Sequence, residues 1–250
     1  MKKVLGYIFT PVFYLFFGLL LLIFHPIQYI AYKFFGYKAH KATVDILNFF
    51  LTYCDLIIGS SVKFKNDYQL PVGRPIIFVA NHQSMYDIPP LIWFLRKYHA
   101  KFISKIELTK GIPSISFNLK VGGGANIDRG NRKQAISELI KLGRRMKDNN
   151  WSATLFPEGT RSKNGLLKPF QFGGITTLLQ TVPNALVVPI AIQNSWKLVK
   201  DGNFPLSFGE KLSWTVLEPI EPEDKDPEEV CQIAENAIRA FLGQEIRMIT

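Results

Sequence analysis

A histidine and an aspartate, His82 and Asp87, are the side chains in this chain that are best placed for catalysis. They directly follow residues 76–80, an unbroken apolar run that predicts a buried parallel strand. On a regular helix the two side chains would point about 140° apart, but in a turn after a strand they can meet. A carboxylate that hydrogen-bonds one imidazole nitrogen fixes the tautomer and raises the basicity of the other nitrogen. The pair could therefore act as a general base.

The same pair also has a purely structural interpretation. Asp87 could be the N-cap of the following helix, whose first turn can hold Pro89 and Pro90. His82 could be an ordinary buried or surface histidine. In both interpretations, His82 and Asp87 lie at the carboxyl end of a strand, where open α/β sheets bind their ligands. A second motif decides between them.

Residues 156–162, with the sequence Phe-Pro-Glu-Gly-Thr-Arg-Ser, follow another predicted strand in the same way. Arg161 in such a turn can clamp a phosphate, because its planar guanidinium binds two oxygens at once. Gly159 would let the backbone approach a ligand closely. Taken alone, Glu158 and Arg161 could be a surface ion pair in a loop. Together with the His82 turn earlier in the chain, chance is a poor explanation for this motif.

The elements that must position these turns alternate between strands and helices. Strands are predicted at residues 62–65, 76–80, 100–104, 152–156, 185–192 and 211–216. Helices are predicted from the His82 turn to about residue 97 and at residues 132–147, 173–180 and 230–242, the last after an acidic linker at 218–229. Residues 122–129 form a glycine-rich loop that runs into a strand end. This alternation predicts an α/β fold, with a single layered domain and a mostly parallel central sheet.

Two hydrophobic segments precede this domain. Residues 4–24 carry no charge and are long enough to cross a bilayer, and His25-Pro26 is expected to break the helix. Residues 43–58 place apolar side chains on one helical face, which makes this segment amphipathic. The first helix could span the membrane, the two could enter one leaflet as a hydrophobic helical hairpin, or they could be core helices. Membrane attachment is the preferred interpretation.

The composition also favours a membrane surface. Of the 250 residues, 47% are hydrophobic and 20 are Phe, which is high for a fully soluble protein. Cys54 and Cys231 lie far apart, without metal or redox spacing, and are interpreted as reduced cytosolic thiols. The predicted division is residues 1–60 as membrane-anchoring helices and residues 61–250 as the catalytic domain.

The net charge of +10 is concentrated in residues 96–147, which carry thirteen Lys and Arg against three acidic residues. Such a surplus can attract nucleic acid, anionic lipid or an anionic substrate. No nucleic-acid-binding pattern accompanies it, so no nucleic acid is expected as a partner. The helix predicted at residues 132–147 is basic on its polar face, which is first interpreted as a solvated surface.

The two strand-end motifs resemble those of the glycerolipid acyltransferase family, and within it those of the 1-acylglycerol-3-phosphate O-acyltransferases. The resemblance covers roughly residues 60–220. The first family motif, His-x4-Asp, stands as His82 to Asp87, and the third, Phe-Pro-Glu-Gly-Thr-Arg-Ser, stands unchanged at residues 156–162. Both motifs are specific, so the resemblance implies an α/β acyltransferase domain for residues 61–250.

Other positions agree with the family pattern less specifically. Residues 124–129 match a glycine followed by an Ile-x-Arg-like end, and residues 187–190 match an apolar strand with a central proline. Lys105 precedes Glu-Leu, as is common between the first two motifs. Residues 168–174 depart from the pattern, because they lack the lysines that many members carry after their Pro-Phe pair. The head group of the acceptor is therefore left open.

The resemblance implies transfer of a fatty acyl chain from acyl-CoA or acyl carrier protein to the sn-2 hydroxyl of lysophosphatidate, giving phosphatidate. His82, held by Asp87, would be the general base for a direct attack, since no Gly-x-Ser-x-Gly turn points to an acyl-enzyme. The acyl thioester is a co-substrate, and no cofactor or metal is predicted. The predicted substrate-binding residues are Lys105, Arg129, Glu158, Gly159, Thr160 and Arg161.

Each of these residues has an expected role. Lys105, Arg129 and Arg161 would hold the acceptor phosphate. Backbone N–H groups near Gly159 would stabilise the oxyanion of the tetrahedral intermediate. Glu158 would orient Arg161 or the glycerol hydroxyl.

Two alternatives to this function stay open. A related enzyme could acylate another lysolipid, such as a lysophospholipid with a head group or a lyso-aminolipid. A non-catalytic membrane protein could instead bind anionic lipid through the basic surplus. The three other histidines, His25, His40 and His99, have no partner pattern and are interpreted as structural. The expected location is the cytoplasmic membrane, with the active site facing the cytosol where soluble thioester donors occur.

Overall fold

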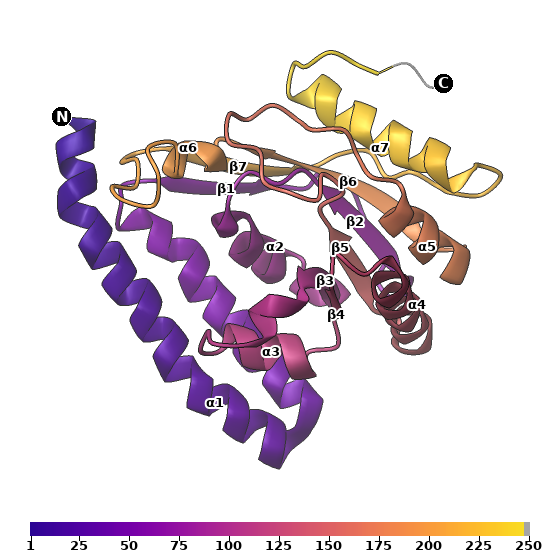
Figure 1. The fold of residues 1–250 in the computed structure, drawn as a ribbon, viewed down its shortest axis with the longest axis horizontal. Coiled ribbons are helices and arrows are strands. Elements are labelled where there is room, and N and C mark those ends of the chain that lie inside the picture. Colours follow the sequence, from indigo (N-terminus) through magenta and orange to yellow (C-terminus); the bar gives the residue numbers. More distant parts are fainter. Residues whose placement is uncertain (248–250) are drawn as a thin grey trace.

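A seven-stranded sheet with helices on both faces forms the centre of the computed structural model, which describes residues 1–247 (Figure 1). Its strands are β1 (Ser61–Lys65), β2 (Ile76–Ala80), β3 (Ala100–Lys105), β4 (Ala125–Ile127), β5 (Ser152–Leu155), β6 (Leu186–Gln193) and β7 (Lys211–Val216). They lie in the order β1-β7-β6-β2-β5-β3-β4. All neighbours are parallel except β6 and β7. The predicted α/β fold with a mostly parallel sheet is confirmed.

The sheet separates two apolar cores because side chains alternate between its faces along each strand. On β2, which is buried throughout, Ile76 and Phe78 face one core while Ile77 and Val79 face the other. Helices α1 and α2 contribute to the first core, and α4, α5 and α7 contribute to the second. The bounds of these helices are α1 (Lys2–Tyr53), α2 (Ile88–Phe94), α4 (Arg132–Asn149), α5 (Gly173–Thr181) and α7 (Pro227–Phe241).

Helix α1 folds back on itself at Gly36, so that its two segments form the predicted hydrophobic hairpin (Figure 1). The expectation that the first helix breaks at His25-Pro26 is wrong, because Pro26 lies inside a continuous helical segment. A proline removes one backbone hydrogen bond, which the surrounding helix tolerates here. Gly36 instead adopts φ 77° and ψ −169°, a conformation open to glycine but strained for other residues. The direction of the chain therefore reverses at the glycine.

The hairpin packs against the turn that holds His82 and Asp87 on its inner side and exposes apolar side chains on its outer side. The rings of Phe13 and Phe17 lie 5.5 and 6.1 Å from the ring of Tyr86. By length and composition, α1 is a helix that could cross a membrane. Near the hairpin turn, Phe34 and Phe35 are 68% and 74% exposed. The hairpin thus offers an apolar surface that the other residues described in the structure do not cover.

Several short elements were not predicted from the sequence. Helix α3 (Ile115–Val121) and helix α6 (Ser195–Leu198) lie in stretches without a clear period. Helix α7 begins at Pro227, inside the segment expected to be a linker, and the Asp226 side chain accepts the Glu228 N–H at 2.7 Å as its N-cap. The remaining short elements are four 3-10 turns, η1 (Cys54–Leu56), η2 (Met85–Asp87), η3 (Arg96–Tyr98) and η4 (Ile106–Thr109).

Candidate active site

The turn between β2 and α2 brings His82 and Asp87 into contact. The His82 Nδ1 atom lies 2.8 Å from Asp87 Oδ2, as the sequence predicts for a turn rather than a helix. The chain reaches this geometry because Ser84 begins the short turn η2, where its Oγ accepts the Tyr86 N–H at 3.1 Å. One imidazole nitrogen is thereby fixed, and Nε2 is left for a substrate.

The Asp87 carboxylate is fully buried and surrounded by hydrogen-bond donors. Its Oδ2 accepts the backbone N–H groups of Gln83 and Ser84 at 2.6 and 2.9 Å. Its Oδ1 accepts the hydroxyl of Ser195, the first residue of α6, and that of Ser84. Asp87 occupies the N-cap position of α2, as the structural interpretation expects, but its side chain makes no cap hydrogen bond to that helix. The carboxylate instead accepts hydrogen bonds from the His82 turn, so the N-cap position and the contact with His82 are compatible.

The His82 ring is held from a second side by Phe156, at the end of β5. The two rings stack with centroids 4.1 Å apart and an interplanar angle of 15°. The His82 side chain remains 15% exposed and lines a cavity. Together, the carboxylate and the aromatic ring restrict the imidazole to one orientation facing that cavity.

Glu158 connects the second motif to the first. Its Oε1 accepts the His82 N–H at 2.7 Å and its Oε2 accepts the Lys168 N–H at 2.9 Å. The side chain is 4% exposed, and burial raises the pKa of its carboxyl to about 7. Within residues 1–247 it forms no ion pair with Arg161. A further link runs from the Ser162 N–H to the His82 carbonyl at 2.7 Å.

Residues 159–161 form the rim of the cavity. Gly159 has φ +71°, and a Cβ there would lie 3.1 Å from the Gln171 amide nitrogen, so a side chain would have little room. The Lys168 ammonium donates to Thr160 Oγ1 at 2.8 Å and to the Arg161 carbonyl at 2.9 Å. Lys168 therefore supplies a positive charge at this rim, a contact that sequence reasoning did not anticipate.

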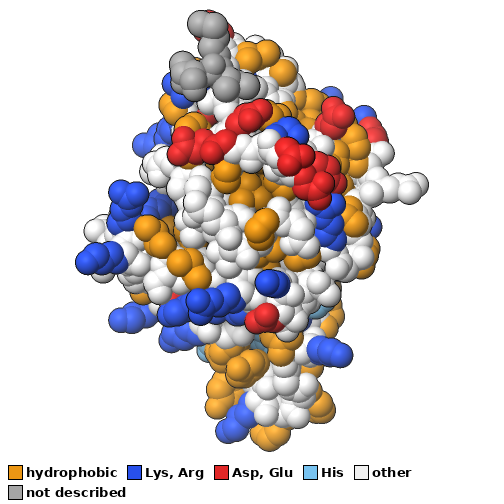
Figure 2. All heavy atoms as spheres, turned by 90° about the vertical axis from the view of Figure 1, so that its right-hand side faces the viewer, with side chains coloured by type: hydrophobic (Ala, Val, Ile, Leu, Met, Phe, Trp, Pro, Cys, Tyr) orange, Lys and Arg blue, Asp and Glu red, His pale blue; other side chains and the backbone are white. Residues whose placement is uncertain are grey.

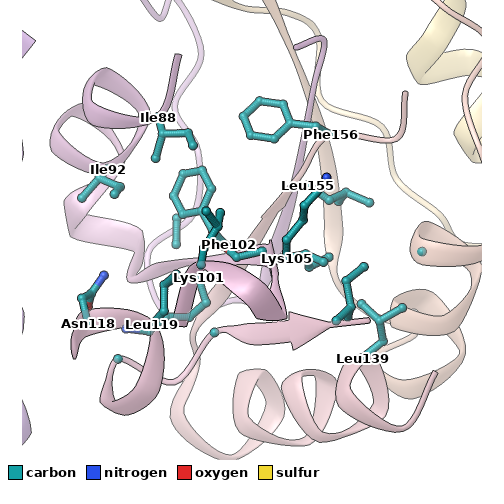
Figure 3. Close-up of a pocket in the computed structure, with 18 of the residues that line it drawn as sticks. Ile88, Ile92, Lys101, Phe102, Lys105, Asn118, Leu119, Leu139, Leu155 and Phe156 are labelled. Carbon is teal, nitrogen blue, oxygen red and sulfur yellow. The ribbon is translucent and has the colours of Figure 1, made fainter. Parts of the chain in front are cut away.

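The cavity has a volume of about 1460 Å³ and brings most of the predicted site residues together (Figure 3). Lys105 reaches it from the end of β3, beside Leu155 and Phe156 in Figure 3. Arg129 reaches it from the loop after β4. Partial burial lowers the pKa of the Arg129 guanidinium, and the nearby Glu107 carboxylate opposes that shift. The predicted residues that line the cavity are His82, Lys105, Arg129, Gly159, Thr160 and Arg161.

Asp87 and Glu158 do not line the cavity and instead support the residues that do. The supporting residues that sequence reasoning missed are Gln83, Ser84, Phe156, Lys168 and Ser195. Gln83, Ser84 and Phe156 stand inside the two motifs, so their position was a usable signal. Ser195 lies more than a hundred residues from Asp87 in the chain and carried no local signal.

Much of the remaining cavity wall is apolar. Figure 3 shows Ile88 and Ile92 of α2 on one side and Leu139 of α4 on the other. The His82–Asp87 pair beside cationic side chains, in a cavity with much apolar wall, suits a ligand with an anionic group and a hydrocarbon chain. Within the part of the chain that the structure describes, no three His, Cys, Asp or Glu side chains cluster as metal ligands.

Comparison with known proteins gives consistent results. Residues 61–193 match the protein family described as Acyltransferase. The chain is 35% identical over 152 residues to the chloroplastic 1-acyl-sn-glycerol-3-phosphate acyltransferase BAT2 of Brassica napus, covering 56% of this chain and 40% of that protein. It is 27% identical over 200 residues to 1-acyl-sn-glycerol-3-phosphate acyltransferase alpha of Ovis aries, covering 80% and 68%. It therefore spans less than half of the first relative and about two thirds of the second.

A solved structure shares the fold over almost the whole chain. This is the crystal structure of the 1-acyl-sn-glycerophosphate (LPA) acyltransferase PlsC from Thermotoga maritima, with a TM-score of 0.76 and 22% sequence identity. The match covers 99% of this chain and 100% of that chain. The sheet order and the α1 hairpin thus belong to an arrangement seen before.

Proposed function

This chain belongs to the acyltransferase family, and we propose that it transfers a fatty acyl group from an acyl thioester to the sn-2 hydroxyl of lysophosphatidate, giving phosphatidate. The observation that carries the proposal is the 2.8 Å contact between His82 and Asp87 at a cavity lined by cationic and apolar side chains. The names of the relatives, several of which are 1-acyl-sn-glycerol-3-phosphate acyltransferases, support the same reaction.

His82 would act as the general base. Its Nε2 takes the proton from the acceptor hydroxyl while the hydroxyl oxygen forms a bond to the thioester carbonyl carbon. The carbon–sulfur bond then breaks, and the imidazolium returns its proton to the leaving thiolate. Asp87 keeps the imidazole in the required tautomer and stabilises its charged form. The products are an ester and a free thiol.

The oxyanion that forms in this step needs hydrogen-bond donors. The Gly159 N–H is already engaged, because it donates to the Phe156 carbonyl at 3.1 Å. The next two residues, Thr160 and Arg161, line the cavity directly after Gly159, whose φ is positive. Their backbone N–H groups have no acceptor within residues 1–247. These two groups would stabilise the oxyanion, a contribution usually worth on the order of a hundredfold or more in rate for each donor.

Three exposed cations would hold the acceptor phosphate: Lys105, Arg129 and Arg161. The neutral Gln171 amide also lines the cavity, close to Gly159. This observation supports a second candidate, in which the same chemistry acylates a lysolipid whose head group is an amine or a larger polar group. Turnover of competing lysolipids would separate the two acceptors.

The acyl donor would bind along α4, because the two candidate donors are both anionic. Figure 2 shows Lys and Arg side chains gathered on the face of the molecule where α4 lies, with acidic side chains above them. The exposed cations of α4 are Arg132, Lys133, Lys141, Arg144 and Lys147. Ile136 and Ile140 of the same helix line the cavity, so the basic face adjoins it. The phosphates of CoA or the acidic surface of acyl carrier protein would fit there.

The α1 hairpin would hold the enzyme on the cytosolic face of the membrane. Its turn carries Phe34 and Phe35 exposed, with Lys33 and Lys38 close by in sequence. Apolar aromatic side chains flanked by lysines suit the boundary between acyl chains and head groups. The hairpin would enter one leaflet and bring the cavity to the lipid substrate.

The proposal is tested by thiol release from palmitoyl-CoA, catalysed by the detergent-purified full chain with lysophosphatidate as acceptor. Release should require both the acceptor and His82, so that the His82→Ala variant stays folded but loses turnover. His99→Ala serves as the matched control, since His99 lies outside the cavity and should retain activity. If no thiol is released from acyl-CoA or from acylated carrier protein with any lysolipid of a panel, the result would instead favour a non-catalytic lipid-binding protein.

A further inference from the structure

Two polar side chains of α1, Gln28 and His40, are buried in the cavity wall without hydrogen-bond partners. They are 0% and 1% exposed, and both line the cavity. Both polar atoms of Gln28 and both ring nitrogens of His40 have no partner within residues 1–247. Buried polar atoms in native proteins are almost always paired, and leaving one unpaired is unfavourable. The four atoms therefore point to a polar group supplied from outside the chain.

This pair lies far from the reacting bond. The Phe17 ring packs 6.1 Å from Tyr86, next to Asp87, and Gln28 follows about three turns later, roughly 16 Å along the same helical segment. His40 lies on the returning segment, where its ring contacts Tyr32 at 5.7 Å. Between the His82 turn and this pair, the α1 part of the wall is formed by the apolar Phe17, Val44, Leu47 and Leu51 and by the polar Lys41, Asp45 and Asn48. A ligand would reach the polar pair along a wall that is partly apolar.

The charged side chains on the same wall make contacts within the wall, and one carboxylate oxygen among them has no partner. Lys41 pairs with Asp45 Oδ2 at 2.5 Å, and the Lys101 ammonium donates to the Tyr37 hydroxyl. Asp45 Oδ1 is a further buried acceptor without a partner within residues 1–247, and a hydroxyl could donate to it. Gln28 offers one amide donor group and one acceptor, and a neutral imidazole offers one of each. A neutral group that both donates and accepts, such as a hydroxyl, matches this set better than an ion, which would need a free counter-charge.

We propose that Gln28 and His40 form a distal recognition element, which binds a neutral hydrogen-bonding group, a hydroxyl or an oxo group, carried far along a lipid chain. The inference rests on the proposed function, since it concerns a lipid chain in the same cavity. The chain belongs either to the acyl donor or to the lysolipid acceptor, which present the same chemistry. A purely apolar chain that reached this wall would leave the four polar atoms unpaired.

Equilibrium binding to the catalytically inactive His82→Ala protein tests this element without depending on turnover. One arm compares palmitoyl-CoA with palmitoyl-CoA analogues that are hydroxylated at successive distal carbons. The other arm compares palmitoyl lysophosphatidate with the corresponding hydroxylated lysolipids. In one of the two arms, the ligand with its hydroxyl at the matching carbon should bind about fivefold more tightly than the ligand without a hydroxyl. A fivefold change in affinity is about the size expected for one neutral hydrogen bond. Equal affinities in both arms would overturn the proposal.

Variants identify the side chains responsible. Gln28→Leu and His40→Phe, each added to His82→Ala, should reduce the affinity ratio to about one. Thr52→Val is the matched control, because Thr52 is a buried polar residue of α1 that does not line the cavity and should keep the ratio. Gln28→Leu should also leave the thermal midpoint unchanged or higher, since it removes no hydrogen bond. A lower midpoint would show that Gln28 holds the hairpin by contacts of its own and would contradict the proposal.

Wild-type turnover of plain palmitoyl-CoA is measured separately. Its absence would count against the proposed function, whereas equal binding of plain and hydroxylated ligands would count only against the distal recognition element. The two failures are therefore distinguishable.

Discussion

At the scale of single residues, the site depends on a carboxylate that is buried only because it is fully hydrogen-bonded. Asp87 accepts two backbone N–H groups and two hydroxyls in addition to the contact with His82. Burying a charge without such partners would be strongly unfavourable. The same donors fix the carboxylate in position, so the orientation of His82 is set before any substrate binds.

We expect Asp87→Asn to lower turnover on the order of a hundredfold to ten-thousandfold, because an amide no longer fixes the tautomer or stabilises the imidazolium. The measurement is kcat with acyl-CoA and lysophosphatidate, with circular dichroism to confirm folding. Ser195→Ala provides a graded comparison, since it removes one donor to Asp87 and leaves His82 in contact. Equal, small losses in both variants would show that Asp87 acts only as a structural residue.

Glu158 should make stability depend on pH. Its pKa is raised from 4.5 to about 7 by burial, so the folded protein holds this proton more tightly than the unfolded chain. The contribution to stability is present below about pH 4.5 and is lost as pH rises through about 7, a change of about 3 kcal/mol. Denaturant unfolding across this interval should show the slope in the wild type and lose it in Glu158→Gln.

The surface carboxylate variant Glu138→Gln is the control for this experiment and should keep the wild-type slope. If Glu158→Gln keeps the slope as well, another group titrates in this range and the buried carboxylate is not its source.

At the scale of elements, the sequence predicted which segments are strands and helices better than where they begin and end. The apolar run of β2 and the amphipathic period of α4 were strong local signals, and both are confirmed. The reversal of α1 at Gly36 was missed. A proline in the sequence is a recognised signal for a helix break, whereas the positive φ of this glycine depends on how the whole chain folds. Helix α3 was missed because its seven residues are too few to show a period.

The basic face of α4 should control affinity for the acyl donor. Lys141→Glu with Arg144→Glu places two negative charges on an exposed surface beside the cavity, and we expect KM for the donor to rise about tenfold at low salt, with kcat little changed. The difference from the wild type should shrink as ionic strength rises. Lys63→Glu with Lys65→Glu, on β1 at the opposite edge of the sheet, should leave KM unchanged. If the Lys141→Glu, Arg144→Glu variant keeps the wild-type KM for the donor, the donor does not bind along α4.

At the scale of the whole molecule, long-range contacts complete what the motifs begin. Ser195 reaches Asp87 from the start of α6, Glu158 reaches His82 from the turn after β5, and the α1 hairpin supplies one wall of the cavity. The family resemblance assigned both motifs to one site, and the two turns do meet, since parallel strands end at one edge of a sheet. The motifs could not predict Ser195 or the wall of α1, because these contacts depend on the packing of elements distant in sequence.

The apolar turn of the hairpin should decide membrane attachment. Phe34→Asp with Phe35→Asp should weaken binding to vesicles by about tenfold or more, because it removes two exposed rings and adds charge at the bilayer boundary. Turnover of substrate dispersed in detergent should remain, since the cavity is intact. Val72→Asp, at an equally exposed apolar position in the loop before β2, should leave vesicle binding unchanged. Full vesicle binding by the double variant would show that another surface attaches the protein.

The central claim is that the His82 site transfers an acyl chain to the sn-2 hydroxyl of lysophosphatidate. The most direct measurement supplies isotope-labelled palmitoyl-CoA and unlabelled lysophosphatidate to the wild type and to His82→Ala, and identifies the lipid product by mass spectrometry. We predict phosphatidate with the label at sn-2 from the wild type and none from His82→Ala. Labelled phosphatidate from both proteins would contradict the role of His82, and labelled free fatty acid without phosphatidate would contradict the transfer itself.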